Sequence, residues 1–160
     1  MATKRKQMQN LIRYYKDQTG KTEVDMREVA KFALSSGWQM PKPKDPLDRL
    51  AAEFSQAARD EIRHDQITGR PYRANHAIPI TQGKIQYHLW VDIDEAPRKH
   101  IYKSLIMRRE QMVGDGVSLT LDAQHWNNVN PEKEPIQMLL DFTDDVEWRL
   151  NAPEEDEKVA

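Results

Sequence analysis

Histidine and carboxylate side chains are the first residues in this sequence that could do chemistry. The chain has five histidines, and His88 and Asp92 lie four positions apart, just before Asp94 and Glu95. On one strand these two side chains would point to the same face, where imidazole and carboxylate could hold a divalent cation. The spacing is generic, and the sequence contains no HExxH, P-loop or GxSxG motif. We therefore expect no metal, no cofactor and no catalytic residue, and a metal-dependent enzyme stays a minor alternative.

Arginine, lysine and glutamine side chains form the second set, because they neutralise phosphates and pair with base edges. Residues 1–113 hold 21 Lys and Arg against 14 Asp and Glu, whereas residues 114–160 hold 3 against 12. The formal net charge of −2 is thus the difference between a basic body and an acidic end. This asymmetry favours a polyanion partner for the body. The alternative is that the charge asymmetry is an ordinary statistical fluctuation, together with an acidic tail that keeps the protein soluble.

Length and composition bound the class of protein. A chain of 160 residues predicts one domain, or one domain with an appendage, and four Trp, five Tyr and three Phe can supply a core. No apolar run is long enough for a membrane span, and the basic N-terminus lacks the apolar stretch of a signal peptide. The absence of cysteine excludes disulfides and thiolate zinc sites and fits a reducing compartment. We therefore expect a cytoplasmic protein with no membrane segment.

Two helices are predicted near the N-terminus. Thr3 can cap a helix that runs to about Gln18 and ends at Gly20. A short extended piece follows at residues 21–24. Asp25, with Glu28 three residues later, then predicts a capping box for a second helix that ends at Gly37.

A third helix is predicted after a proline-containing linker. It starts near Asp45 and Pro46 and runs to about His64, with Glu61 as the one charged residue on its apolar side. We expect that glutamate to be paired at the rim of the helix rather than buried. The apolar side consists of Leu47, Leu50, Ala51, Phe54, Ala58 and Ile62.

A change from helical to strand periodicity follows the turn at residues 68–71. Apolar residues alternate with polar ones over residues 72–80 and again over residues 85–93. The intervening Thr81, Gln82 and Gly83 predict a hairpin with a three-residue loop. Pro79 cannot donate to a ladder, so its strand should lie at a sheet edge.

This order of elements resembles that of a winged helix-turn-helix domain: helix, short extended piece, helix, helix and hairpin. The resemblance is topological, covers about residues 4–93 and rests on no signature motif. The position of Pro79 agrees with it, because the first wing strand of such a domain lies at the edge of the sheet. Two features depart from it: the connection at residues 37–44 is longer than a tight turn, and the third helix is long for a recognition helix.

The resemblance implies duplex-DNA binding, with the third helix in the major groove and the hairpin tip near the backbone or the minor groove. Glu53 and Asp60 oppose this hypothesis, because they share the exposed face of the third helix and would repel phosphate. A solvated helix face with mixed charges is the alternative. The expected contacts come from the third helix, the turn and hairpin after it, the N-terminus and the linker: Arg49, Gln56, Arg59, Arg63, Arg70, Arg73, Gln82, Lys84, Lys4, Arg5, Lys6, Lys42 and Lys44.

The second half of the chain predicts a helix at residues 97–113, ended by Gly114, Asp115 and Gly116. Strands at 117–121 and 136–140 would pair as a hairpin around a loop at 125–131, and a last helix would span 144–150. The predicted fold class is therefore α+β. It combines a winged-helix-like domain at 1–96, a C-terminal helix with a small β/α extension at 97–152, and a disordered acidic tail at 153–160.

Trp126 and Trp148 stand among acidic residues in this second half, as core aromatics or as anchors for a partner protein. A further hypothesis is autoinhibition, in which the acidic end competes with phosphate for the basic body. Taken together, the sequence predicts a non-enzymatic nucleic-acid-binding regulator or accessory protein, with duplex DNA as the expected partner and a homodimer as the expected assembly. The alternative is a protein-interaction adaptor that uses the same fold and the acidic, aromatic extension.

Overall fold

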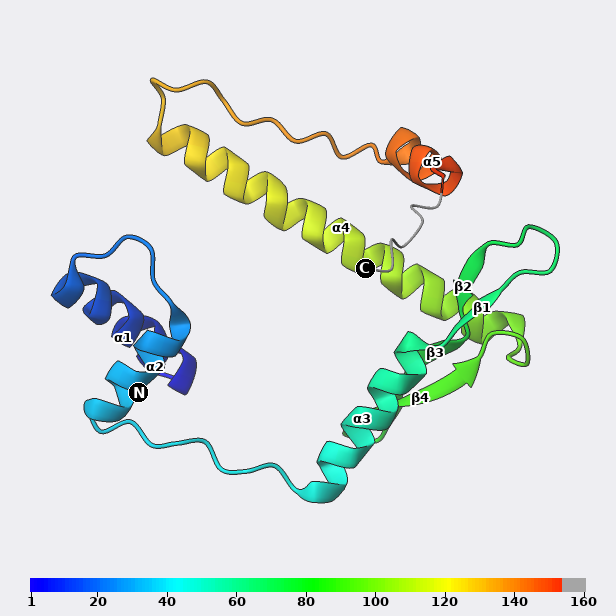
Figure 1. The fold of residues 1–160 in the computed structure, drawn as a ribbon, viewed down its shortest axis with the longest axis horizontal. Helices are drawn as coiled ribbons and strands as arrows, with labels where there is room; N and C mark the ends of the chain where they lie inside the picture. The colour runs from blue at the N-terminus through cyan, green and yellow to red at the C-terminus, as the bar shows by residue number, and fades with distance from the viewer. Residues whose placement is uncertain (154–160) are drawn as a thin grey trace, which may run out of the picture. The chain divides into compact units, whose positions relative to one another are not determined.

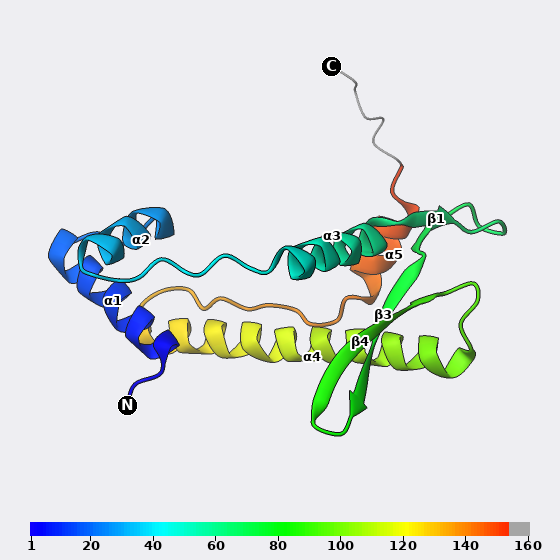
Figure 2. The same ribbon diagram turned by 90° about the horizontal axis from the view of Figure 1, so that it is seen from below.

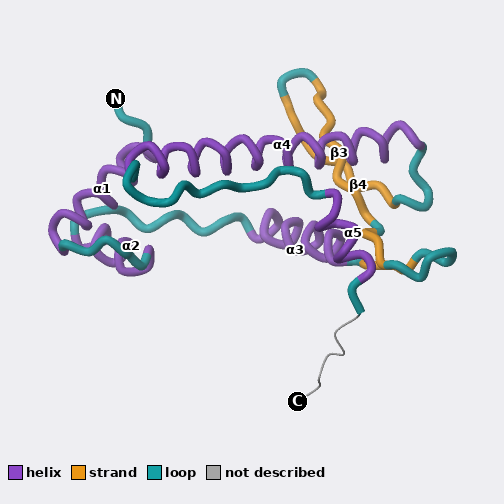
Figure 3. Tube along the Cα trace, turned by 90° about the horizontal axis from the view of Figure 1, so that it is seen from above, coloured by secondary structure: helices purple, strands orange, loops and turns teal. Residues whose placement is uncertain are grey.

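The computed structural model describes residues 1–153, and within them the fold is mixed α+β, with five helices and two small antiparallel sheets (Figures 1 and 3). The α+β class is thus confirmed. The predicted tail at 153–160 lies, apart from Pro153, outside the described residues. Along the chain the elements are α1 (Lys4–Thr19), α2 (Met26–Ser35), α3 (Pro46–Asp60), β1 (Ile62–His64), β2 (Pro71–Arg73), β3 (Asn75–Gln82), β4 (Ile85–Asp92), α4 (Arg98–Val129) and α5 (Thr143–Asn151).

The chain divides into two compact units, Met1–Ala52 and Glu53–Ala160, and α3 begins in the first and ends in the second. The predicted boundary after residue 96 falls inside the second unit and stays a prediction. Among the helices described between residues 1 and 153, none is both long enough and apolar enough to cross a bilayer.

The first unit is a pair of capped helices. The Thr3 hydroxyl accepts from the backbone N–H of Lys6, and Gly20, at φ 67°, ends α1 in the left-handed conformation. Asp25 caps α2 by accepting from the N–H of Arg27 at 2.8 Å. The predicted capping box is incomplete, however, because Glu28 pairs with Lys31 at 2.8 Å. Residues 21–24 form no strand.

Aromatic packing holds the two helices of this unit together. Tyr15 and Phe32 meet edge to face with ring centroids 5.4 Å apart, and Tyr15, Val29 and Ala33 are buried. Tyr15, Val29 and Ala33 are thus the buried apolar residues of the first unit.

The helix α3 ends earlier than predicted. Asp45 caps it by accepting from the N–H of Leu47 at 2.9 Å, as expected, but the helix stops at Asp60 instead of His64. Residues 62–64 pair instead with 71–73 as the β1–β2 ladder. The turn between them is held by the Asp65 carboxylate, which accepts from the N–H groups of Ile67 and Thr68. Pairing with Arg73, eleven residues away, therefore overrides the helical pattern at Ile62.

The β3–β4 hairpin confirms the change to strand periodicity but corrects its limits. Gln82 pairs with Ile85, so the loop has two residues, Gly83 and Lys84, rather than the predicted three. Gly83 has φ 64° and Lys84 has no positive φ, as in a type II′ turn. Tyr72, predicted in the same strand as Ile80, belongs to β2. Ala74 separates β2 from β3 and is fully buried.

The helix α4 overturns the predicted organisation of the second half. It runs for 32 residues through Gly114, Asp115 and Gly116, which were expected to end it, and through the predicted strand at 117–121 and most of the predicted loop at 125–131. Two glycines cost only about 1 kcal/mol each relative to alanine, and the returning chain lies against the uninterrupted helix through Leu140 and Phe142. The described residues of the extension therefore contain no β-hairpin, because the partner strand is helical.

The chain returns along α4 after residue 129, as Figures 1 and 2 show. The Asn127 side chain fixes the start of this return, since it accepts from the N–H of Ile136 at 2.8 Å and donates to the carbonyl of the same residue at 2.9 Å. Residues 136–140 are extended but pair with no strand. The predicted last helix is confirmed as α5, and Asp141 accepts from the Thr143 N–H at its first turn.

Candidate functional site

A cationic cavity of about 260 Å³ in the second unit gathers side chains from α3, both sheets and α4. We name it the arginine pocket. Its charged and aromatic lining residues include three arginines and two histidines, and no Asp or Glu among residues 1–153 lines it. These residues are Arg59, Arg73, Arg108, His76, His88 and Trp90.

The hairpin supplies one wall of the arginine pocket. His88 and Trp90 are two residues apart on β4, so their side chains leave the same face of the sheet. In the ladder they stand opposite Pro79 and Ala77, which also line the cavity. The alternation of the strand thus places an imidazole and an indole side by side.

Trp90 also positions the first arginine. The Arg59 guanidinium, from the last turn of α3, lies 5.3 Å from the centroid of the Trp90 ring. Such a cation–π contact is worth about 0.5–1 kcal/mol at an exposed site and leaves the N–H groups of the guanidinium available. Within residues 1–153, no ion pair involves Arg59, Arg73 or Arg108. Three positive charges therefore meet at the pocket without a carboxylate to neutralise them.

His76 joins the hairpin to α4 beneath the pocket. It is buried, its Nε2 lies 3.2 Å from the Arg73 carbonyl and its Nδ1 lies 3.0 Å from the Ser104 hydroxyl. A carbonyl only accepts, so Nε2 carries the hydrogen and, in the neutral ring, Nδ1 accepts from Ser104. Ser104 is the one buried residue of α4. The pair fixes the backbone of Arg73 against the helix that carries Arg108.

Arg63 belongs to a separate cluster, which corrects its predicted place. It lies on β1 and not on the third helix, and its guanidinium pairs with Glu61 at 3.0 Å, Asp92 at 2.8 Å and Asp94 at 2.8 Å. These hydrogen bonds, led by that to Asp94, raise the pKa of Arg63. The Tyr72 hydroxyl also donates to Asp94, at 3.0 Å, which raises the pKa of the tyrosine. The charge of Arg63 is thus neutralised within the fold.

Two carboxylates of this cluster, those of Glu61 and Asp92, have lowered pKa values. A hydrogen bond from Asn75, and then the bond and charge of Arg63, lower the pKa of Glu61. The backbone N–H of Asp94, followed by Arg63, lowers the pKa of Asp92. Asp92 is therefore engaged by Arg63 while His88 faces the arginine pocket, and the described residues contain no group of three His, Asp or Glu placed to hold a metal.

The other predicted contact residues are spread over both units. Lys4, Arg5 and Lys6 are in the first turn of α1, Lys42 and Lys44 in the linker, and Arg49 in the part of α3 that belongs to the first unit. Gln56 donates to Asp60 at 2.9 Å, Arg70 donates to Asn151 at 3.1 Å, and Gln82 accepts from Tyr87 at 3.3 Å. Lys84 lies in the hairpin turn.

Of the predicted residues, only Arg59 and Arg73 meet in the arginine pocket. His76, His88, Trp90 and Arg108 were missed as members of this site. The alternation of β4 could have paired His88 with Trp90, but no local pattern brings Arg108 to the hairpin. Its place depends on how α4 packs against β3.

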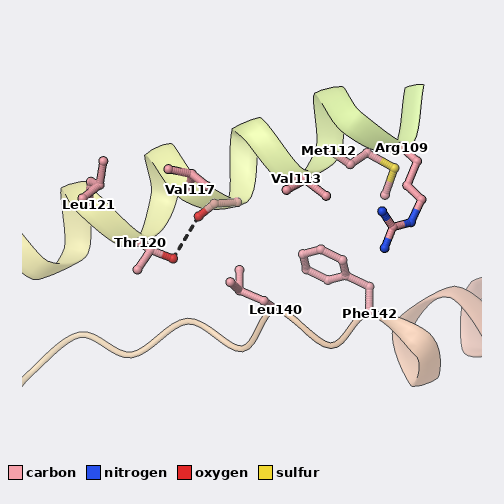
Figure 4. A pocket seen from close by; sticks show the side chains of 9 residues that line it. Arg109, Met112, Val113, Val117, Thr120, Leu121, Leu140 and Phe142 are labelled. Atoms are coloured by element: carbon pink, nitrogen blue, oxygen red, sulfur yellow. Dashed lines mark hydrogen bonds between the residues drawn. The ribbon is translucent and has the colours of Figure 1, made fainter. Parts of the chain in front are cut away.

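A second cavity, of about 440 Å³, lies between α4 and the returning chain (Figure 4). Leu140 and Phe142 face Met112, Val113 and Val117 across it, and most of its lining is apolar. The two predicted partner anchors differ: Trp126 on α4 is half-buried, whereas Trp148 on α5 is 73% exposed. The second cavity offers packing surface but no polar group suited to chemistry apart from Arg109 and Thr120.

Comparison of the chain with protein families, curated proteins and solved structures gives no match to any of the three.

Proposed function

We propose that this protein binds nucleic acid, with duplex DNA as its expected form, and that the arginine pocket is the site of phosphate contact. The observation that carries the proposal is the convergence of Arg59, Arg73 and Arg108 with Trp90, where no carboxylate of the described part of the chain lines the cavity. Guanidinium groups bind phosphate oxygens through paired N–H donors, and they keep their charge at any physiological pH.

The size of the pocket supports a polymer rather than a whole cofactor as the ligand. A volume of about 260 Å³ lies below the range of about 300–1,000 Å³ usual for small-molecule sites. It suits a phosphate with its sugar, while the rest of the duplex stays outside. The flanking aromatic and cationic groups are those used to hold nucleic-acid backbones and bases.

The winged-helix interpretation extends the proposed nucleic-acid contact surface beyond the arginine pocket. Helices α1, α2 and α3 precede the β3–β4 hairpin, with the β1–β2 ladder inserted between α3 and β3, and Arg59 from α3 meets residues of the hairpin at the pocket. Lys84 at the hairpin tip would reach the backbone or the minor groove. Under this proposal the recognition helix ends at Asp60, and Arg63 is excluded from the contact surface because its carboxylate partners occupy it.

The first prediction tests the pocket with Arg73→Ala/Arg108→Ala. We expect at least a tenfold loss of affinity for a fluorescent DNA duplex, because two phosphate contacts disappear from an uncompensated site. Each lost contact should also reduce the slope of log K against log salt by about 0.9. Fluorescence anisotropy at several salt concentrations measures both quantities.

The matched control is Arg98→Ala/Lys99→Ala, which also removes two positive charges, both from the part of α4 outside the pocket. This control should weaken binding by less than about threefold, because it lowers only the overall positive electrostatic potential of the protein. Equal losses in the two double variants, or no binding by the unsubstituted protein, would contradict the proposal.

A protein-interaction adaptor is the second candidate, and the exposure of Trp148 favours it. An indole that is 73% exposed beside Asp144 and Glu147 is an unusual surface feature. Trp148→Ala should then abolish capture of a partner protein from cell extract without changing DNA affinity. Unchanged capture would remove the adaptor alternative.

A further inference from the structure

The helix α4 carries a large apolar surface that its own unit leaves exposed. None of its apolar side chains is buried, although it has 32 residues. Contiguous exposed patches of this kind mark interaction surfaces in soluble proteins. Nine of its large apolar residues are exposed: Tyr102, Leu105, Ile106, Met112, Val113, Val117, Leu119, Leu121 and Val129.

One stripe of this surface has the repeat of a helix–helix seam. Leu105, Met112, Leu119 and Trp126 recur every seventh residue, which is close to two helical turns. We name these four residues the α4 seam. The first three are exposed and Trp126 is half-buried, and Met112 also lines the second cavity. Gly116 lies beside this stripe near its centre and faces the returning chain, since a Cβ there would meet Leu140 at 3.8 Å.

The seam is symmetric about its own midpoint. If two copies of α4 lie antiparallel with a twofold axis between residues 115 and 116, Leu105 meets Trp126 of the other copy. In the same register Met112 meets Leu119. Every seam residue then has an apolar partner, and the helix centre, where Gly116 stands, lies at the axis.

The charges of α4 are complementary in this orientation. Residues 98–109 contain five Lys and Arg and no Asp or Glu, whereas residues 110–129 contain three Asp and Glu and no Lys or Arg. Antiparallel pairing sets the basic half against the acidic half, and Arg109 falls level with Asp122. Parallel pairing would set like charges together. A twofold interface requires a surface that complements itself, and this one does.

We infer that two copies of this chain form a dimer through antiparallel packing of their α4 seams. The inference rests on α4 alone and is independent of the proposed nucleic-acid binding. The self-complementary register and charge pattern favour a second copy over an unrelated protein as the occupant.

Solution mass with a matched pair of variants tests the dimer. Light scattering after gel filtration at micromolar concentration should give twice the chain mass of 18.7 kDa. Leu119→Glu should shift the protein to the monomer, because it places a carboxylate in the seam. Leu121→Glu, two residues away and on the opposite side of the helix, should leave the dimer intact. Both residues are exposed in the protomer, at 40% and 57%, so neither variant should unfold it, and circular dichroism checks this.

Disulfide trapping tests the orientation, since the chain has no cysteine of its own. A Met112→Cys chain is mixed with a Leu119→Cys chain that carries a size tag, and the mixture is oxidised. Antiparallel pairing predicts mainly the mixed disulfide between the two chains, whereas parallel pairing predicts two self-linked species. The inference would be overturned if the unsubstituted protein is a monomer, or if the two glutamate variants are both monomers or both dimers. A majority of self-linked species in the trapping experiment would also overturn it.

Discussion

At the scale of single residues, the neighbours of an arginine decide what it can do. Arg63 and Arg59 were both expected to contact nucleic acid, yet Arg63 is held by three carboxylates whereas Arg59 rests on Trp90 with no acidic partner. The carboxylates around Arg63 compensate its positive charge, so this guanidinium does not attract a phosphate group. The same residue type, four positions apart, is therefore structural in one place and available for binding in the other.

The Arg63 cluster should make stability depend on pH. The pKa values of Glu61 and Asp92 are lower in the folded state than when unfolded, so their contribution is complete above about pH 5 and is lost as pH falls through the folded values. Arg63→Ala should lower Tm by a few degrees at pH 7, and this difference should shrink as the pH approaches 3. Calorimetry from pH 7 to pH 3 measures it. A difference that grows at low pH would contradict the assignment.

At the scale of elements, α4 shows how context decides where a helix ends. A Gly-Asp-Gly sequence usually interrupts a helix, but here it lies in the middle of 32 helical residues. The flanking residues favour helix, and the returning chain packs against the continuous helix through Leu140 and Phe142. The glycines are tolerated because the tertiary contacts require an uninterrupted helix.

Gly114→Ala should therefore stabilise the protein by about 0.5–1 kcal/mol, because alanine restricts the unfolded chain and favours helix. A Cβ at this position meets no atom within 4 Å, and the position lies away from the α4 seam. Chemical denaturation measures the gain, with Gly83→Ala as the contrasting variant. Gly83 has φ 64°, so alanine there should destabilise the hairpin. A loss of stability in Gly114→Ala would show that α4 is interrupted at this point.

At the scale of the whole molecule, the two proposals have a joint consequence. The α4 residues of the arginine pocket are centred about eight positions from the proposed axis, so a dimer would carry two pockets about 24 Å apart along the helix. A nucleic acid that reaches both pockets should bind with higher affinity than one that reaches a single pocket, because the second binding event is intramolecular.

The dimer-breaking Leu119→Glu variant should therefore lose at least tenfold affinity for a duplex of about 20 base pairs. Its affinity for a DNA hairpin with a stem of about six base pairs should change little, because that ligand reaches one pocket only. Anisotropy with both ligands, at equal salt, measures the difference. No loss for either ligand would show that the pockets act independently of the dimer, and equal losses for the two would show that the substitution damages each pocket directly.

Much of the local structure could be predicted from the sequence. Thr3, Asp25 and Asp45 begin three helices as expected, because a capping side chain needs only backbone groups two or three residues away. The change of periodicity after residue 71 likewise located the hairpin. The candidate site could be predicted only in part. Arg59 was expected on the exposed face of a helix and Arg73 near the hairpin, but nothing in the sequence indicated that the two line one cavity.

The sequence by itself determined the features that depend on near neighbours or on composition: the helix starts, the hairpin, the lack of cysteine, and the division into a basic body and an acidic end. Only the tertiary structure decided that Ile62–His64 leaves the helix for a ladder, that α4 continues past Gly116, and that Arg108 reaches Trp90. The physical reason is that these outcomes depend on partners distant in the chain, whose contacts outweigh local propensities of about 1 kcal/mol.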